Sequence, residues 1–264
     1  MPLSLPEPDR TQLPRSPLEV VVAQVRHENR LVASDSNTAR AVHETLGGSD
    51  GSYPFIDSAS ATVMLNLVVA GPGVSPPAAN TESQLTGWRL HDGENAWAVT
   101  LMPDHFALET TRYTTWEEFG PRLMAVIGAV SEHVGPAFEQ RLGLRYIDRL
   151  REPVVSEIAG WRPYIRREVL GILCHPDLGD AVVGAQQQVL LSLDDGVTGT
   201  LRHGPIRDPE GKAVQYLLDY DVFRQGGRPF VADEIRDTFN SFNTAALQLF
   251  QATVAPDLLD YLGT

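Results

Sequence analysis

The order of strand-like and helix-like segments constrains the fold of this chain more than any other feature. Three short segments with strand character, separated by turn signals, are followed at once by a helix-like segment over 116–134; the three are 87–92, 95–102 and 105–113. In the middle one, Trp97, Val99 and Leu101 share one face, which is the period-2 pattern of a half-buried strand. Strands joined by tight turns and followed by a helix predict an antiparallel meander covered by that helix.

The helix expected after the meander has clear start and stop signals. Thr115 and Glu118 have the spacing of a capping box, and Gly135-Pro136 ends the segment. Its apolar residues recur at helical intervals; they are Trp116, Phe119, Leu123, Ile127, Val130 and Val134.

The second half of the chain repeats this order. The segment 184–204 reads as a hairpin around Asp195-Gly196, 213–223 as a further strand, and 233–254 as a long amphipathic helix. Both long helices end with a V-x-P signal followed by L-G, at 134–143 and at 254–263. This likeness favours two related halves, 18–150 and 151–264, that form one continuous sheet and one compact unit, although chance agreement between short stop signals is the alternative. The predicted class is α+β, with antiparallel meanders each packed by a long α-helix.

The remaining segments are less regular. Residues 1–17 contain five prolines, and we expect a flexible arm, extended or disordered, that orders on binding. Strands are expected at 18–26 and 61–69, a helix at 37–46, and a loop at 71–80.

The segment RLGLRYIDR, residues 141–149, places Arg141, Arg145 and Arg149 at intervals of four. This spacing fits one ridge of a helix or one face of a strand. A helix breaker on each side, Pro136 and Pro153, and Gly143 within the segment favour a strand. The three arginines then share one face, and Tyr146 lies on the other.

Two interpretations of this arginine face stay open. In the first, the arginines form structural ion pairs with acids from other strands, since an unpaired buried charge is costly; the candidates are Glu109, Asp148, Asp219 and Asp221. In the second, Arg141, Arg145 and Arg149 with Tyr146 bind an anionic ligand. The acidity of the chain favours the ion pairs.

Four segments together resemble a sporadically distributed family of bacterial proteins of similar length. They are SPLEVVVAQVR (16–26), WRLHDGENAWAVTLMPDHFALETTRYTTWEEF (88–119), RLGLRYIDRL (141–150) and LLDYDVF (217–223). The family shares an R-x-G-L-R-Y-x-N-R core and a late L-D-x-D strand, and Asp148 stands here where asparagine is more frequent. The resemblance implies an accessory gene, for example in defence or toxin neutralisation. It implies no reaction and no catalytic residues.

Composition excludes several classes of protein. The formal charge is −13, and every one of the 21 Lys and Arg residues is arginine except Lys212. This charge repels phosphate backbones and suits a basic or amphipathic protein partner better than nucleic acid. No apolar run reaches the ~20 residues of a membrane helix, and the N-terminus lacks the features of a secretory signal. With Cys174 as the only cysteine, we expect a cytoplasmic protein.

Catalytic motifs are absent from the sequence. There is no G-x-S-x-G, H-E-x-x-H, P-loop or dinucleotide fingerprint, and Cys174-His175 has no second ligand pair at metal spacing. We therefore predict no cofactor, no metal and no catalytic residue. The leading hypothesis is a non-enzymatic protein-binding module, such as an antitoxin-like, chaperone-like or defence subunit, with homo-oligomers left open. The alternative is a protein that binds an anionic small ligand or a nucleotide, with or without catalysis.

Overall fold

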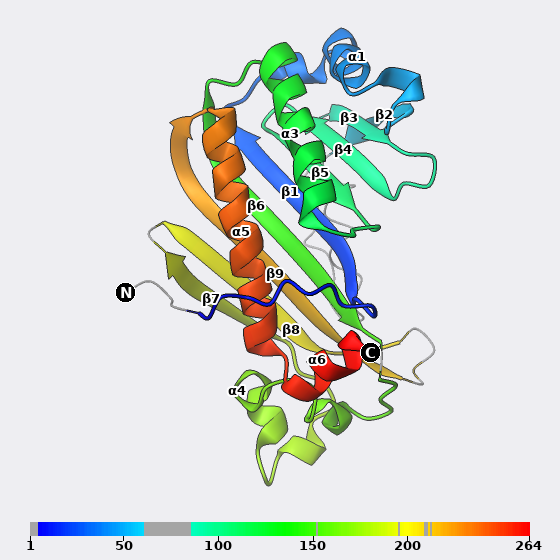
Figure 1. Cartoon of the computed structure of the whole chain (residues 1–264), viewed down its shortest axis with the longest axis vertical. Helices are drawn as coiled ribbons and strands as arrows, with labels where there is room; N and C mark the ends of the chain where they lie inside the picture. The colour runs from blue at the N-terminus through cyan, green and yellow to red at the C-terminus, as the bar shows by residue number, and fades with distance from the viewer. Residues whose placement is uncertain (1–4, 61–85, 152, 195, 209–210, 212) are drawn as a thin grey trace. The chain divides into compact units, whose positions relative to one another are not determined.

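The computed structural model of the chain describes residues 5–60, 86–151, 153–194, 196–208, 211 and 213–264. Its strands form one sheet of nine strands in the order β2-β3-β4-β5-β1-β6-β9-β8-β7 (Figure 1). Neighbours along the chain pair antiparallel in the meander β2 to β5 and in the run β7 to β9. The predicted α+β class with one continuous sheet is confirmed.

The elements have the following bounds. The strands are β1 (Leu18–His27), β2 (Phe55–Ser60), β3 (Thr86–His91), β4 (Trp97–Met102), β5 (His105–Thr110), β6 (Phe138–Leu150), β7 (Gln187–Asp194), β8 (Val197–Arg207) and β9 (Val214–Pro229). The α-helices are α1 (Ser36–Thr45), α3 (Trp116–His133), α4 (Arg167–Leu170), α5 (Ala232–Thr253) and α6 (Pro256–Gly263). Short 3₁₀ turns lie at Leu31–Ser34, Gly48–Asp50, Ile158–Trp161, Gly171–Cys174 and Gly179–Ala181.

The chain forms two compact units, each assembled from separate stretches of sequence. The first unit comprises Met1–Val21, Leu144–Arg224 and Asn240–Thr264, and the second comprises Val22–Gly143 and Gln225–Phe239. The elements β1, β6, β9 and α5 therefore contribute residues to both units. Division of the chain into duplicated halves, 18–150 and 151–264, stays a prediction.

In the second unit, the helix α3 packs on the meander as its apolar stripe predicts. The ring of Phe119 lies 5.9 Å from that of Trp97 in β4, and Leu123, Ile127 and Val130 are buried. The Thr115 side chain accepts a hydrogen bond from the Glu118 N–H at 3.3 Å, so the predicted cap is present. The helix stops before Gly135, whose φ of 62° suits glycine.

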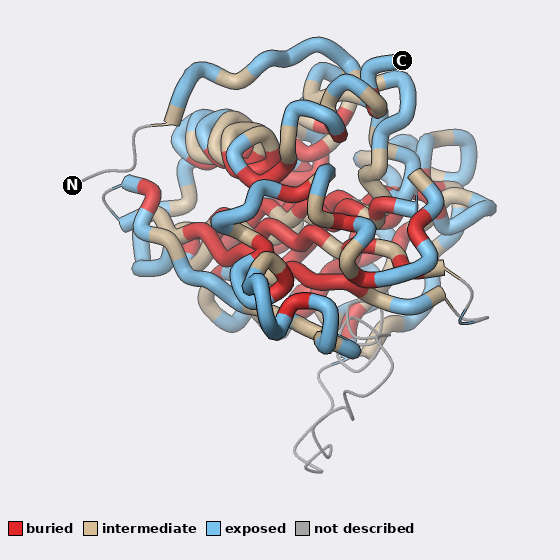
Figure 2. Tube along the Cα trace, turned by 90° about the horizontal axis from the view of Figure 1, so that it is seen from below, coloured by how far each residue is buried: buried red, intermediate tan, exposed pale blue. Residues whose placement is uncertain are grey.

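In the first unit, the later part of α5 packs on the strands. The Tyr146 hydroxyl of β6 donates to Asn243 Oδ1 at 2.8 Å, and the ring of Tyr220 in β9 lies 6.5 Å from that of Phe250. A Cβ on Gly199 of β8 would lie 3.3 Å from Leu249, so this strand approaches the helix closely. Buried residues concentrate along the strands, and exposed residues along loops and outer helix surfaces (Figure 2).

The described part of the proline-rich arm, residues 5–17, has no regular secondary structure and lies along α5 and α6. The Gln251 side chain forms two hydrogen bonds with the main chain of Asp9: its Oε1 accepts from the N–H at 3.0 Å, and its Nε2 donates to the carbonyl at 2.6 Å. Gln248 donates to the Pro6 carbonyl at 2.9 Å. The Arg15 guanidinium lies 4.7 Å from the ring centre of Tyr261 in α6.

Some expectations could not be compared with the structure, and one strand was missed. The predicted strand 61–69 and loop 71–80 lie outside the described residues. The sequence gives little sign of β2, because FIDSAS is short and largely polar; its pairing with β3 makes it a strand. In the parts of the chain that the structure describes, no helix is both long and apolar enough to cross a membrane.

Candidate functional site

The arginine segment belongs to β6, so the strand interpretation is confirmed, but its three arginines have three different partners. Arg145 forms a two-point ion pair with Asp219 of β9, with Nε–Oδ1 at 2.7 Å and Nη2–Oδ2 at 2.6 Å. Arg149 Nε donates to Glu19 Oε2 of β1 at 2.7 Å. Arg141 Nη1 donates to Gln24 Oε1 at 3.3 Å. These contacts lead to separate places on β1 and β9.

Two carboxylates in the first unit each serve two arginines. Asp219, whose side chain is 5% exposed, also receives Arg202 Nη1 at 3.4 Å, and Glu19 also receives Arg151 Nη2 at 2.7 Å. Burial alone would raise the pKa of Glu19, but hydrogen bonds and charge from Arg151 and Arg149 hold that pKa below its ordinary value. These two carboxylates therefore each hold a pair of guanidinium groups in the first unit.

The other predicted acids take different positions. Glu109 of β5 forms an ion pair with Arg89 of β3 within the meander. Asp221 lies opposite Thr200 in the pairing of β9 with β8. Asp148 is buried, and burial, together with the charge of Asp219, raises its pKa to about 7.

Tyr146, which the alternative interpretation placed with the arginines, faces α5 instead. Its hydroxyl is buried against Asn243, whereas Arg145 reaches the buried carboxylate of Asp219. Tyr146 and Arg145 are neighbours along a strand, so their side chains point to opposite faces of the sheet. The structure therefore does not bring Tyr146 into one site with the arginines.

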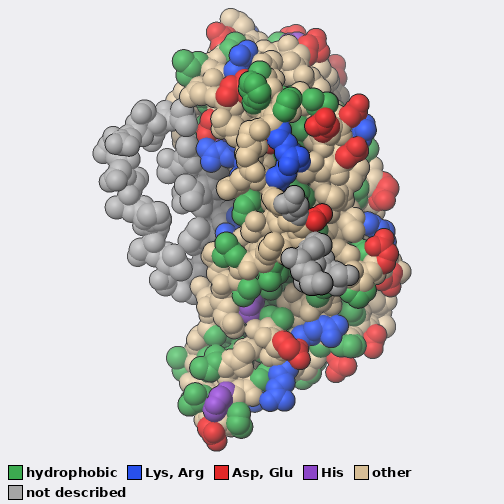
Figure 3. Space-filling view, turned by 90° about the vertical axis from the view of Figure 1, so that its left-hand side faces the viewer, with side chains coloured by type: hydrophobic (Ala, Val, Ile, Leu, Met, Phe, Trp, Pro, Cys, Tyr) green, Lys and Arg blue, Asp and Glu red, His purple; other side chains and the backbone are tan. Residues whose placement is uncertain are grey.

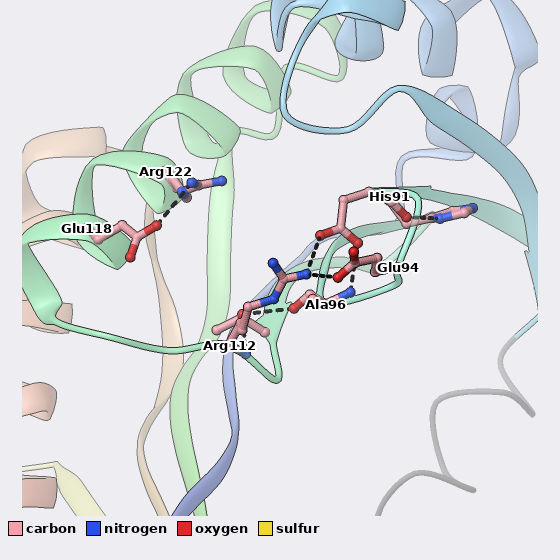
Figure 4. A network of polar contacts seen from close by, with 8 residues as sticks. His91, Glu94, Ala96, Arg112, Glu118 and Arg122 are labelled. Atoms are coloured by element: carbon pink, nitrogen blue, oxygen red, sulfur yellow. Dashed lines mark hydrogen bonds and ion pairs between the residues drawn. The ribbon is translucent and has the colours of Figure 1, made fainter. Parts of the chain in front are cut away.

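The second unit contains a polar network at the turn between β3 and β4 (Figure 4). Arg112 pairs with Glu94, and the Ala96 N–H donates to Asp92 Oδ1 at 2.7 Å. Thr110 Oγ1 donates to the Ala96 carbonyl at 2.8 Å. Each of these groups is bound to the turn or to the strand next to it, so the network holds the hairpin in shape.

Arg122 of α3 has a comparable structural role beside this hairpin. Its guanidinium lies 4.2 Å from the ring centre of Trp97, and its Nη2 lies 3.1 Å from Glu118 one turn earlier in the helix. A guanidinium over an aromatic face is attracted by the ring quadrupole. The pair Glu118–Arg122 is also visible in Figure 4.

The motif around Cys174 forms a turn. The Asp177 N–H donates to His175 Nδ1 at 3.2 Å, and the residues from Gly171 to Cys174 form a 3₁₀ turn. A buried pair that the sequence did not indicate lies nearby, His203 Nδ1 with the Tyr216 hydroxyl at 2.9 Å. Burial lowers the pKa of His203. Among the described residues, no group of three or more His, Cys, Asp or Glu could hold a metal ion.

The outer edge of β7, in the first unit, combines a lack of charged residues with exposed apolar side chains. Among the described strands, β7 is the last in the sheet order, with β8 as its one neighbour. Residues 181–193, which run through most of this strand, contain no charged residue and no proline; we call them the uncharged edge. Within it Leu190 is 64% exposed and Val189 is 39% exposed. Figure 3 views the chain from the side on which Figure 1 draws β7.

Further apolar residues are exposed close to the uncharged edge in the sequence. Val183 lies within it, and Ile172 and Leu178 precede it. The hairpin containing β7 was predicted, and the missing charges are visible in the sequence. Only the strand order shows that this segment borders the sheet.

Comparison with known proteins finds no family model that matches this chain and no curated protein that matches it.

Proposed function

We propose that this protein is a non-enzymatic, cytoplasmic protein-binding module, an accessory subunit of a bacterial defence, antitoxin-like or chaperone-like system. We further propose that it binds an extended segment of its partner by strand addition to β7. In this mode the main chain of the partner supplies hydrogen bonds to the open strand edge, and alternate side chains supply specificity.

The observation that carries the proposal is the lack of protection on the uncharged edge. An open strand edge exposes unpaired N–H and C=O groups, and proteins usually protect such edges with Lys, Pro, inward charges or a cover. From Gln187 to Ser192 the pairing with β8 is regular, and the only irregularity is a register shift between Ser192 and Asp194. An edge that is regular, uncharged and lined by Leu190 favours pairing with another strand.

The arginine contacts support a binding role over a catalytic one. Arg145 and Arg149 are each bound to a carboxylate of the same chain, and a paired guanidinium has fewer donors for a reacting group. The charge of −13 favours a partner segment with basic flanks.

The test is capture of partners from the native host, combined with amide hydrogen exchange of the complex. Binding should protect the amides of β7, because added main-chain hydrogen bonds block exchange. Leu190→Asp should abolish capture, because it places a charge in the middle of the new strand pair. Leu31→Asp, at a residue 74% exposed in the second unit, should leave capture unchanged. Capture that survives Leu190→Asp, or a complex without protection of β7, would refute strand addition.

A second candidate function follows from the shared carboxylates. Arg202 donates to Asp219 and Gln188, and Arg151 donates to Glu19. A guanidinium has five N–H donors, so both arginines retain donors for an anionic ligand such as a phosphate or nucleotide. A thermal-shift series with inorganic phosphate and nucleotides tests it. A ligand at 100 times its Kd should stabilise the protein by about 2.7 kcal/mol, and Arg202→Gln should reduce the shift. A melting temperature that no anion moves would reject this function.

A further inference from the structure

The central five residues of β7, 188–192, have the same polar and apolar order in both directions, and this property points to an occupant for the uncharged edge. We propose that, in the absence of a partner, β7 of a second copy of this chain pairs antiparallel with β7 about a twofold axis at Leu190. The inference deepens the proposed function, because it uses the same strand edge.

Twofold pairing at Leu190 brings residues of the same character together. In an antiparallel pair centred on Leu190, each residue faces the residue equally far from the centre in the other copy. Leu190 then faces Leu190, Val189 faces Leu191, and Gln188 faces Ser192. Over 188–192, apolar residues meet apolar residues and polar residues meet polar residues, whereas the next pair outward, Gln187 with Leu193, is mixed. Such cross-strand pairs are the unit of sheet stabilisation, each contributing about 0.2–1 kcal/mol.

The faces of the strand are matched as well. Residues alternate between the two faces of a sheet, and directly opposed residues point to the same face. Gln188, Leu190 and Ser192 of one copy therefore share a face with Ser192, Leu190 and Gln188 of the other. The exposed Leu190 side chains cover each other at the axis, which removes apolar surface from water.

Electrostatics favour self-pairing of β7 over self-pairing of the strand at the other border of the described sheet. Two copies with a charge of −13 each repel one another. The 181–193 segment contributes no charge to that repulsion at the contact. The strand at the other border of the sheet, β2, contains Asp57, which is bound to His91 of β3. Self-pairing of β2 would bring two acids close together, so β7 is the better edge.

Cysteine cross-linking tests the register as well as the contact. In a Cys174→Ser background, Leu190→Cys should form a disulfide-linked dimer under mild oxidation. Facing residues in antiparallel strands have Cα atoms about 4.5–5.5 Å apart, within disulfide reach. Ser192→Cys should not cross-link by itself, because the two copies of residue 192 would lie four residues apart along the strand, about 13 Å. A mixture of Gln188→Cys and Ser192→Cys proteins should cross-link only as the heterodimer.

Sedimentation of the purified protein gives an independent reading. A concentration-dependent dimer is expected for the wild type, with Leu190→Asp weakening association at least tenfold and Leu31→Asp leaving it unchanged. A monomer at every concentration, or cross-linking of Ser192→Cys as efficient as that of Leu190→Cys, would overturn the proposal.

If the protein is monomeric but partner capture still depends on Leu190, the self-pairing fails and the proposed function stands. If a dimer depends on Leu190 but no partner is captured, the self-pairing stands and the proposed function fails.

Discussion

Asp148 of β6 differs strongly from an ordinary carboxyl group. Burial and the charge of Asp219 raise its pKa from 3.8 to about 7. Between these two pH values the folded state keeps a proton that the unfolded state has lost. The free energy of unfolding contributed by this group therefore falls as the pH rises from about 4 to about 7, and it stays at the lower level above 7.

Asp148→Asn removes this pH-dependent cost, because asparagine remains neutral. We expect the variant to be more stable than the wild type by up to about 4 kcal/mol at pH 8.5, and by about half as much at pH 5.5, which lies midway between the two pKa values. Urea unfolding at the two pH values measures the difference. An equal effect at both values would mean that Asp148 does not titrate between them. Asp237→Asn, the same substitution at an exposed position, is the control.

The ion pair between Arg145 and Asp219 is the second residue-scale feature with a measurable energy. The Asp219 side chain is 5% exposed and that of Arg145 is 19% exposed, so loss of one partner leaves a poorly solvated charge. We expect Arg145→Glu or Asp219→Arg alone to destabilise the protein by roughly 3 kcal/mol.

The double variant Arg145→Glu/Asp219→Arg should recover part of this loss, because the pair is restored in the opposite order. Recovery is incomplete, since Arg202 would then face an arginine at position 219. A double-mutant cycle by chemical denaturation provides the coupling energy. A double variant that is no more stable than either single variant would contradict the pairing.

At the scale of elements, the arm is held on α5 and α6 mainly by exposed polar contacts. Residues 6, 9 and 10 of the arm are exposed, and Gln251 binds the main chain of Asp9 rather than a specific side chain. Net hydrogen-bond energies of about 0.5–1.5 kcal/mol predict local release of such a segment well before global unfolding.

Gln251→Ala should therefore loosen the arm and leave the rest of the fold intact. We expect faster amide exchange at Asp9 and earlier proteolytic cleavage within residues 5–13, with a loss of global stability of about 1 kcal/mol or less. Gln140→Ala, at an exposed glutamine of β6, is the matched control. Unchanged exchange at Asp9 would show that packing, rather than Gln251, holds the arm.

At the scale of the whole molecule, charge and the open edge act against each other. A net charge of −13 per chain opposes association, while the uncharged edge favours it. Salt screens repulsion between charges beyond a Debye length of about 10 Å at 0.1 M ionic strength, and it has little direct effect on main-chain hydrogen bonds in a strand pair.

Self-association through β7 should therefore strengthen as NaCl is raised. Sedimentation at low and at moderate ionic strength should show a larger dimer fraction in the second condition, and Leu190→Asp should remove most of the increase. Association that weakens as salt is added would indicate an interface built on ion pairs, for which the arginines would be the first candidates.

The sequence by itself determined the local elements of this protein. The period-2 pattern of Trp97, Val99 and Leu101, the cap at Thr115, and the glycine and prolines around the arginine segment act within a few residues. They predicted the meander, α3 and β6 because steric limits and hydrophobic spacing operate at short range. The short polar strand β2 was missed because pairing, and not its own composition, makes it a strand.

Only the tertiary structure decided which distant residues meet and which strand lies at the border. Arg145 and Asp219 are 74 residues apart, and Arg149 and Glu19 are 130 apart. The sequence could propose Asp219 as a partner for the arginines, but nothing in it identified Glu19. The nine-strand order leaves β7 with one neighbour and places β9 between β6 and β8. Both outcomes depend on how strands far apart in the chain pair, and local composition does not encode that pairing.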